Sequence, residues 1–442
     1  MKKLLFLSLF ASLISCSNED LVLDVTIEEP EVAYTKDVIN RRSFEEVVEI
    51  AQKSISILQN NNTETRSKEN IRTLDLTNGV KAICKPTTRS NSGDSINDTL
   101  VYVLNFKDNQ GFAVVSASRQ TDGLIAVTES GHYDPSTPTG IPGFDSYMAR
   151  AYDYVSQESQ KNVIAETRAS SYPLMVKPVY DTIYYKKINP KIEVRWGQGG
   201  RMGQFCCNGL SGCVNTAAAQ VMSYFKYPYS ISLSYSGRDV DSTPLCWTAM
   251  CAHQYTNVAN NRDNADIQIG RLARQLGSLT ISTYNEGETL SSIGKARLAL
   301  LLLGYNVGDV ISISPTNGVF ADSDMYPFAS FLAQNRLILM AGCKAESNKG
   351  HAWVIDGCLY VKALHRLMAT YDGTTWSVFQ ELGTDRTCLN HINWGWNGLC
   401  NGYFNGWIYD ANNAEINDSG VGVDSGTNSA YVKDFEYFTV TH

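Results

Sequence analysis

A cysteine opens the most strongly helical stretch of this chain. Gly212-Cys213-Val214 is followed by a run of alanines and apolar residues that continues to Phe225. Helix N-termini carry unpaired N–H groups and a partial positive charge, which favour a thiolate over a thiol. The thiolate is the nucleophilic form of cysteine. A free cysteine is by default a buried structural residue, so the interpretation of Cys213 depends on the motifs further along the chain.

The pattern after Cys213 changes from helical to strand-like. Apolar spacing predicts helices near residues 267–276 and 292–303. Strands are predicted later, at residues 337–340, 352–355, 388–394 and 431–440. Helices first and strands second predict an α+β domain with two lobes and a cleft between them.

A histidine stands at the start of one predicted strand. Ala352 to Ile355 is a continuous apolar run between Gly350 and Gly357, as expected of a central strand. His351 would then lie at the edge of its lobe, where it could reach the Cys213 thiol. An imidazolium beside a thiolate lowers the cysteine pKa and can protonate a leaving amine. His391 is the alternative base.

Two tryptophan motifs complete the pattern, Trp196-Gly197-Gln198 before the cysteine and Asn393-Trp394-Gly395-Trp396 after the histidine. Cysteine, histidine and asparagine-tryptophan occur in this order in papain-like thiol proteases. The particular motifs resemble the streptopain family of cysteine peptidases. The resemblance implies a papain-like catalytic domain with a helical lobe and an antiparallel sheet lobe.

The same resemblance implies a role for each motif residue. The Gln198 amide and the Cys213 backbone N–H would stabilise the oxyanion of the tetrahedral intermediate. Asn393 stands where a papain-like asparagine would orient the histidine, although the family is better described as a Cys-His dyad. Trp394 and Trp396 would shield the dyad and wall the cleft, or else be plain core aromatics. Gly350 would leave room for a substrate backbone.

The N-terminus has the proportions of a signal peptide. Lys2 and Lys3 precede the apolar run Leu4 to Ile14, which ends in Leu13-Ile14-Ser15-Cys16. This resembles a bacterial lipobox with Cys16 as the lipidated residue; an ordinary secretory signal is the alternative. The acidic residues just after Cys16 resemble a surface-export signal of Bacteroidetes-type lipoproteins. We expect a lipid anchor to the outer membrane or cell surface of a Gram-negative bacterium, with release after maturation as a further expectation.

Four regions are predicted: a signal peptide and lipobox at 1–16, a tether at 17–42, an α+β propeptide domain at 43–170 and the catalytic domain at 171–442. In the propeptide domain we expect a helix from Ser43, a hairpin of residues 101–106 and 112–117, and a strand at 125–127. The hairpin resembles the propeptides of streptopain-like zymogens. The polar segment from Gln157 to Ser171 is interpreted as an exposed linker.

Composition narrows the function further. The net charge is −8 with no basic patch, which argues against a nucleic-acid binder. The chain has 11 cysteines, and apart from Cys16 and Cys213 an odd number remains, so some could pair and at least one stays free. Cys206-Cys207 lacks a matching Cys or His pair, so no metal site is expected.

These observations predict a secreted cysteine endopeptidase made as a zymogen. It would act on proteins or peptides, be inhibited by its own propeptide, need no cofactor and be a monomer. Two alternatives stay open: a transglutaminase-like acyltransferase, and a non-catalytic surface binding lipoprotein.

Overall fold

The computed structural model describes residues 22–24, 41–59, 72–84, 99–161, 175–235, 238–257, 263–313, 322–344, 350–370, 375–406 and 431–442. We call 41–161 the N-terminal module and 175–442 the C-terminal module. Cys16 and the predicted signal peptide lie outside the described residues. No helix among the described residues is long and apolar enough to cross a membrane.

One antiparallel sheet of thirteen strands connects the two modules. Its order is β1-β2-β3-β4-β5-β16-β15-β14-β13-β17-β11, with β12 also paired to β17 and β6 to β14. The connection is made by β5 (Leu124–Thr128) and β16 (Gly402–Asn405), where Thr128 pairs with Gly402. The modules therefore share a continuous hydrogen-bonded backbone.

The N-terminal module contains the elements expected of it. The helix starting after Ser43 is α2 (Phe44–Gln59), and the Ser43 hydroxyl accepts from the Glu46 N–H at 3.3 Å. The predicted hairpin is confirmed as β3 (Thr99–Asn105) and β4 (Phe112–Ser116). The remaining elements are β1 (Val22–Asp24), β2 (Val80–Cys84) and a short 3-10 turn, η2 (Lys107–Asn109).

A second helix, α3 (Pro142–Lys161), was not predicted. Its residues 157–161 fall in the segment interpreted as a linker, so that interpretation is wrong for those five residues. The helix was detectable, because Phe144, Tyr147, Met148, Ala151, Tyr152 and Val155 follow a helical spacing and are all buried.

Alternate residues of the sheet strands in the N-terminal module pack into two separate hydrophobic cores, one on each face of the sheet. In β4, Phe112 and Val114 belong to the cluster that includes α3, whereas Ala113 and Val115 belong to the cluster that includes α2. Successive side chains of a strand point to opposite faces, so α2 and α3 cover opposite faces of the sheet. The α3 core continues into the helices that follow Cys213.

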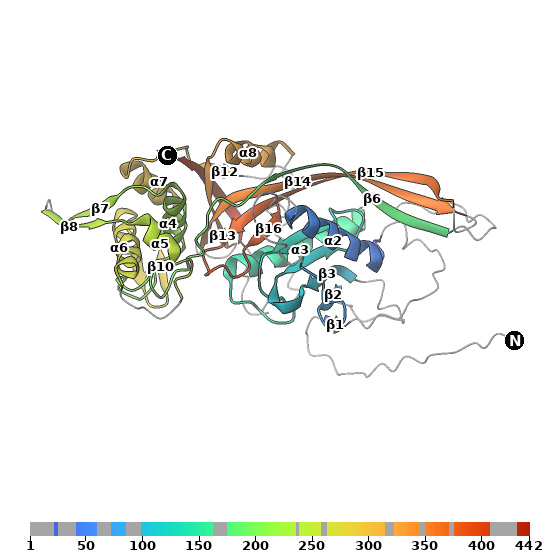
Figure 1. Cartoon of the computed structure of the whole chain (residues 1–442), viewed down its shortest axis with the longest axis horizontal. Helices are drawn as coiled ribbons and strands as arrows, with labels where there is room; N and C mark the ends of the chain where they lie inside the picture. The colour runs from blue at the N-terminus through green and yellow to red at the C-terminus, as the bar shows by residue number, and fades with distance from the viewer. Residues whose placement is uncertain are drawn as a thin grey trace.

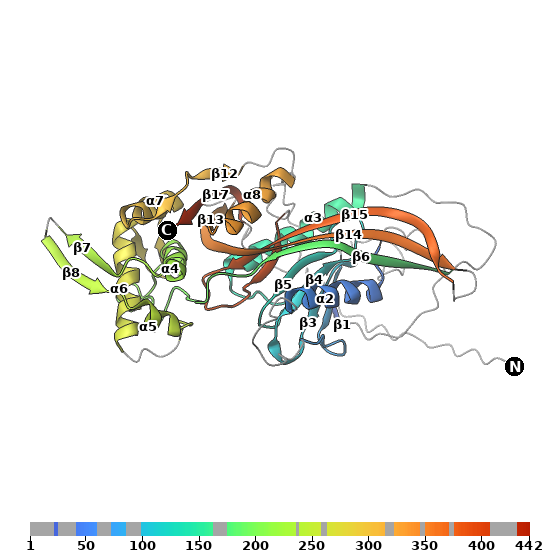
Figure 2. The ribbon, with the colours of Figure 1, turned by 45° about the horizontal axis from the view of Figure 1, so that its top comes forward.

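From Cys213 onward the C-terminal module has its helices before its long strands, as predicted, but it begins with a strand that was not predicted, β6 (Met175–Ile188). Helices α4, α5, α6 and α7 gather at one end of the molecule, while the long strands extend away from them (Figures 1 and 2). The helices are α4 (Cys213–Phe225), α5 (Trp247–Ala252), α6 (Asn264–Leu279), α7 (Ile293–Leu302) and α8 (Asp322–Ala333). Short strands among them are β7 (Ser230–Tyr235), β8 (Arg238–Pro244), β9 (Thr283–Asn285), β10 (Glu288–Leu290), β11 (Asn306–Val307) and β12 (Ile311–Ile313).

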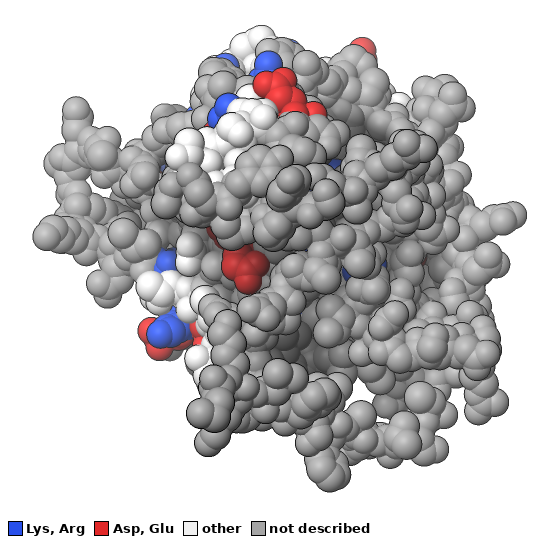
Figure 3. Space-filling model, turned by 90° about the vertical axis from the view of Figure 1, so that its right-hand side faces the viewer, with Lys and Arg blue, Asp and Glu red and all other residues white. Residues whose placement is uncertain are grey.

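The strands of this module are longer than their apolar runs. They are β6 (Met175–Ile188), β13 (Leu337–Lys344), β14 (Gly350–Thr370), β15 (Ser377–Asn393) and β17 (Tyr431–Thr441). The first residues of β14 pair with β13 on one side and, from Val354 on, with β15 on the other, so the predicted strand 352–355 is central; its later residues pair with β6 and β15. On the face drawn in Figure 3, described Lys and Arg side chains lie beside Asp and Glu side chains.

Candidate active site

Cys213 is the first residue of α4, as predicted. Gly212 before it has φ +86°, and a Cβ there would lie 2.9 Å from the carbonyl oxygen of Thr289, so this turn requires glycine. Helix α4 packs against β14, and the backbone N–H groups of Ala352 and Val214 lie near enough to the partly buried thiol to lower its pKa. Ala352 follows His351, so the two predicted site residues come together from α4 and β14.

His351 is buried, and its ring is held by the main chain of the tryptophan motif. Its Nε2 donates to the carbonyl oxygen of Trp394 at 2.8 Å, and its ring centroid lies 6.3 Å from those of Trp353 and Trp396. Burial lowers the pKa of His351 to about 4 and outweighs the hydrogen bond to Trp394, which acts in the opposite direction. Burial also raises the pKa of the Cys213 thiol. Desolvation thus favours the neutral form of both groups and opposes the predicted thiolate–imidazolium pair in this arrangement.

The start of α3 covers the histidine and its tryptophan. A Cβ at Gly143 would lie 2.6 Å from Cε3 of Trp394 and 3.0 Å from Cδ2 of His351. Only a residue without a side chain allows this close approach. The N-terminal module thus fills the space next to the imidazole, and this packing adds to the desolvation that lowers the His351 pKa.

Gln198 lies in the loop that precedes α4. Its backbone oxygen accepts from the Ser211 N–H at 2.9 Å, which fixes the loop near the start of the helix. Its partly buried side-chain amide makes no hydrogen bond to the residues that the structure describes. Trp196 anchors the same loop, because its Nε1 donates to the carbonyl oxygen of His253 at 2.7 Å. A free amide on a fixed loop is what an oxyanion donor requires.

A clamp that the sequence analysis missed holds this loop. The Gly197 N–H donates to the Thr256 hydroxyl at 2.8 Å, and Asn397 Oδ1 accepts from the Thr256 N–H at 2.9 Å. Asn397 has φ +56°, a conformation that asparagine tolerates better than most residues. The family resemblance leads us to expect glycine at this position, and the departure was the one signal that could have revealed the clamp.

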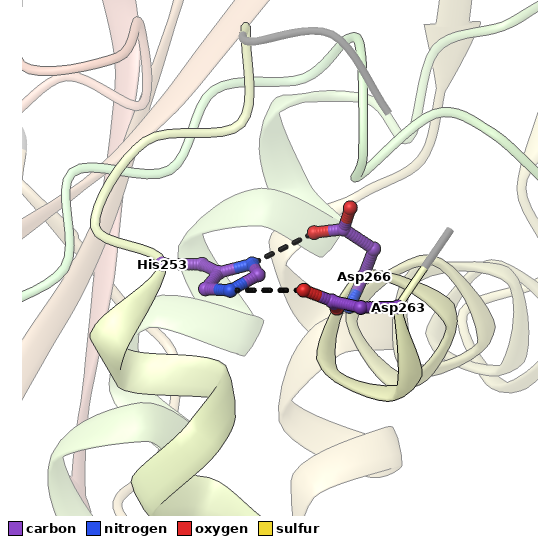
Figure 4. Close-up of side chains that lie close together, drawn as sticks. All are labelled: His253, Asp263 and Asp266. Carbon is purple, nitrogen blue, oxygen red and sulfur yellow. Dashed lines mark hydrogen bonds and ion pairs between the residues drawn. The ribbon is translucent and has the colours of Figure 1, made fainter. Parts of the chain in front are cut away.

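The side chains of one histidine and two aspartates, His253, Asp263 and Asp266, lie close together at the start of α6 (Figure 4). His253 Nδ1 lies 2.7 Å from Asp266 Oδ1, and His253 Nε2 lies 3.4 Å from Asp263 Oδ2. These groups could in principle hold a metal ion, since their ligand atoms lie within 4.8 Å of one another. Arg201 already forms an ion pair with Asp266, and Asp263 accepts the Asp266 N–H as the N-cap of α6. The cluster therefore serves to tie the His253 loop, and through it Trp196, to α6.

Asn393 does not orient His351 through its side chain. Its Nδ2 donates to the Val194 carbonyl at 3.0 Å, and its Oδ1 accepts from Gln220 Nε2 at 3.0 Å. The backbone carbonyl of the next residue, Trp394, orients the His351 ring instead. Asn393 instead joins β15 to the segment before Trp196 and to α4.

The other predicted cleft residues differ in exposure. Trp394 is 1% exposed and packs on Trp353 and Phe404, so it is a core residue in this arrangement. Trp396 is partly buried beside His351, and Gly350 is exposed at the first position of β14. Trp396 and Gly350 are thus the predicted cleft residues that remain accessible while α3 is in place.

His391, the alternative base, belongs to a different cluster. It is buried in β15, with Nδ1 2.6 Å from Asp356 Oδ1 and Nε2 3.4 Å from Glu129 Oε1. Burial alone would lower the His391 pKa, but these two carboxylates outweigh it and raise the pKa to about 10. Its ring packs edge-on against Tyr403, which belongs to the α2 core. His391 thus faces away from Cys213.

The cysteines whose pairing the sequence left open are free thiols wherever the structure describes their side chains. The free cysteines are Cys206, Cys207, Cys213, Cys246, Cys251, Cys358, Cys388 and Cys400. Cys207 and Cys246 are exposed, whereas Cys358, Cys388 and Cys400 are buried. Burial raises the pKa of Cys358 to about 11 and that of Cys400 to about 12, so both are protonated at neutral pH.

Comparisons with known proteins give consistent results. The model of the Peptidase C10 family matches residues 179–404. Streptopain of Streptococcus pyogenes serotype M1 is 26% identical over 342 residues, covering 71% of this chain and 75% of the streptopain chain. The thiol protease/hemagglutinin PrtT of Porphyromonas gingivalis is 23% identical over 348 residues, which are 70% of this chain and 34% of PrtT. The solved structure of a prointerpain A fragment of Prevotella intermedia is similar with a TM-score of 0.47 at 20% identity, covering 81% of this chain and 98% of the fragment.

Proposed function

This chain belongs to the Peptidase C10 family and is a cysteine-type peptidase of the streptopain kind, and we propose that Cys213 is its nucleophile and His351 its general acid. The observation that carries the proposal is the position of the Cys213 sulfur. It lies at the N-terminus of α4, and the backbone N–H of Ala352, the residue next to His351, is near enough to lower the pKa of the thiol.

In the proposed reaction the Cys213 sulfur attacks the peptide carbonyl carbon. The carbonyl oxygen becomes an oxyanion, which accepts hydrogen bonds from the Gln198 amide and the Cys213 N–H. His351, protonated by the thiol, passes that proton to the amine as the C–N bond breaks. Water then hydrolyses the thioester, and the proton that it loses returns to the thiol through His351.

The N-terminal module is, in this proposal, the inhibitory pro-region of a zymogen. Gly143 of α3 packs on His351 and Trp394, and the imidazole donates to a main-chain carbonyl rather than facing a thiolate. Removal of α3 would hydrate the imidazole, raise its pKa and allow the ion pair to form. We place the maturation cut between about Gln157 and Pro173, and within that segment beyond Lys161, where α3 ends.

We further propose that the full chain is exported and lipidated at Cys16, which would hold it at the outer membrane or cell surface until maturation. The support is the sequence Leu13-Ile14-Ser15-Cys16 after a short apolar run. Protein or peptide substrates fit the peptidase family, and the pro-region would be the intramolecular partner.

The experiment compares the thiol at the start of α4, Cys213, with a thiol in the loop before that helix, Cys207. Cys213→Ala should abolish casein hydrolysis and self-processing, whereas Cys207→Ala should leave both unchanged because that thiol is exposed and lies outside α4. Mass spectrometry after treatment with a thiol-reactive protease inhibitor should find the adduct on Cys213. Casein hydrolysis by Cys213→Ala at the normal rate would refute the assignment, and transfer of the acyl group to an added amine in place of hydrolysis would favour an acyltransferase.

A further inference from the structure

A polar cavity of about 260 Å³ lies between the two modules. The N-terminal module contributes Arg72 and Glu129 to its walls, and the C-terminal module contributes Lys187 and Tyr403. Tyr403 belongs to the α2 core, whereas His351 and Cys213 pack with the core on the α3 side. The cavity is therefore separate from the proposed active site and lies across the sheet from it.

Two cationic side chains in this cavity retain donors for a ligand. Both side-chain hydrogen bonds of Arg72 use Nη1, which donates to the carbonyl oxygens of Gln110 at 3.1 Å and Thr128 at 2.6 Å. Its Nε and Nη2 make no hydrogen bond to the residues that the structure describes. Lys187 Nζ donates to the Leu58 carbonyl at 2.5 Å, and an ammonium group has three donors.

The acid in the cavity is already engaged by other cations. Glu129 Oε2 lies 3.1 Å from Arg195 Nη2, and Oε1 lies 3.4 Å from His391 Nε2. Burial lowers the pKa values of Arg72 and Lys187, and the Glu129 charge offsets this only in part. The two carboxylates of this cluster, Glu129 and Asp356, thus face four basic groups, Arg72, Lys187, Arg195 and His391, so basic groups outnumber acidic ones around the cavity.

A buried hydroxyl adds a neutral donor to the same cavity. Tyr403 is 4% exposed, and its Oη has no hydrogen-bond partner among the described residues. An unpaired buried hydroxyl is unfavourable, and a ligand oxygen that accepts its hydrogen bond would remove that cost. Tyr403 and Arg72 line the same cavity, so a ligand bound there can meet both the hydroxyl and the guanidinium.

We propose that this cavity binds a small oxyanion, held by Arg72 and Lys187 and accepting a hydrogen bond from the Tyr403 hydroxyl. Guanidinium and ammonium groups are the usual ligands of phosphate and carboxylate oxygens. Because Arg72 comes from one module and Lys187 and Tyr403 from the other, the bound anion joins the two and opposes their separation. This consequence for maturation rests on the proposed role of the N-terminal module as pro-region.

The binding test uses the full chain carrying Cys213→Ala, which cannot process itself if the proposed function holds. Titration calorimetry with inorganic phosphate, and separately with succinate, at constant ionic strength set by chloride, measures affinity and distinguishes phosphate from carboxylate ligands. Lys187→Gln and Tyr403→Phe should each weaken binding by about tenfold or more, since each removes one hydrogen bond to a charged ligand. Lys186→Gln, at the neighbouring position on β6, should change affinity by less than about twofold.

Equal binding by Lys187→Gln and by the unchanged chain would overturn the site, as would the absence of heat with both anions at millimolar concentrations. The second measurement is the rate of self-processing of the chain with Cys213 intact. The anion that binds should slow this rate, and it should not change the rate of the Lys187→Gln variant. Binding without any slowing would overturn the link to maturation. Failure of the proposed peptidase mechanism would appear only as lost proteolysis and would leave the calorimetry unchanged.

Discussion

The charge state of His391 makes a prediction that can be worked out from the structure. Its folded pKa is about 10, whereas an unperturbed histidine titrates near 6.5. At 1.36 kcal/mol per pKa unit, that difference corresponds to about 5 kcal/mol of folding free energy. The pKa is raised on folding, so this stabilisation is fully present below pH 6.5 and is lost as the pH rises towards 10.

The perturbation is His391→Gln in the full chain carrying Cys213→Ala, which avoids self-digestion. At pH 6 we expect it to cost about 3–5 kcal/mol, because Asp356 and Glu129 lose the cation between them. The cost should shrink steadily between pH 6.5 and 10, where the unchanged protein loses the same stabilisation. Titrating groups that do not interact with His391 are common to the two proteins and cancel in the difference.

The assay is denaturant unfolding at pH 6, 8 and 10, reported as the difference in unfolding free energy between variant and parent. His132→Gln, at an exposed position, is the matched control and should show a small difference at every pH. A His391→Gln difference of the same size at pH 6 and pH 10 would mean that His391 is neutral when folded, and the argument from its two carboxylates would fail. Glu129→Gln should lower the folded pKa of His391, so that its stabilisation is lost at a lower pH.

Four further outcomes are expected. Gln198→Ala should lower kcat by about a hundredfold with little change in KM, as for a lost oxyanion donor, and an unchanged kcat would make Gln198 structural. Asn397→Ala should lower kcat by about tenfold because the loop that carries Gln198 loses its clamp, whereas Asn397→Asp keeps the accepting oxygen and should retain most of the activity. In the double variant with Gln198→Ala, Asn397→Ala should lower kcat little further, and fully additive effects would contradict a role through Gln198. Gly143→Val should weaken the packing of α3 on Trp394 and speed self-processing in a time course followed by gel electrophoresis, whereas slower processing would show that α3 does not restrain the site. Cys16→Ala should move the protein from the membrane to the soluble fraction after cell fractionation, and continued sedimentation with membranes would argue against lipidation.

Local pattern was sufficient where a single element decides the answer. The helix that begins at Cys213 and the strand after His351 were both predicted, because small and apolar residues of the right spacing fix those elements. The exception is α3, whose apolar spacing from Phe144 to Val155 is present in the sequence but was masked by the polar residues after it. The full length of the strands β6, β14 and β15 could not be predicted, because their polar halves lack an apolar pattern and are held by pairing with each other.

Contacts between distant segments were beyond the reach of the sequence. Asn393 was expected beside His351, yet its amide is taken by Val194 and Gln220, which lie 199 and 173 positions away along the chain. The Thr256–Asn397 clamp joins residues 141 positions apart, and nothing in either local pattern requires the other.

The sequence by itself determined the family, the mixed α+β class and the order of cysteine, histidine and tryptophan motifs, because these depend on residue types and spacing within short segments. Tertiary structure alone decided the state of the site. The pKa values of Cys213 and His351 depend on how completely the residues packed around them exclude water, and two neighbouring carboxylates raise the pKa of the buried His391. Desolvation is a property of the packed molecule, so no motif of the chain could have predicted it.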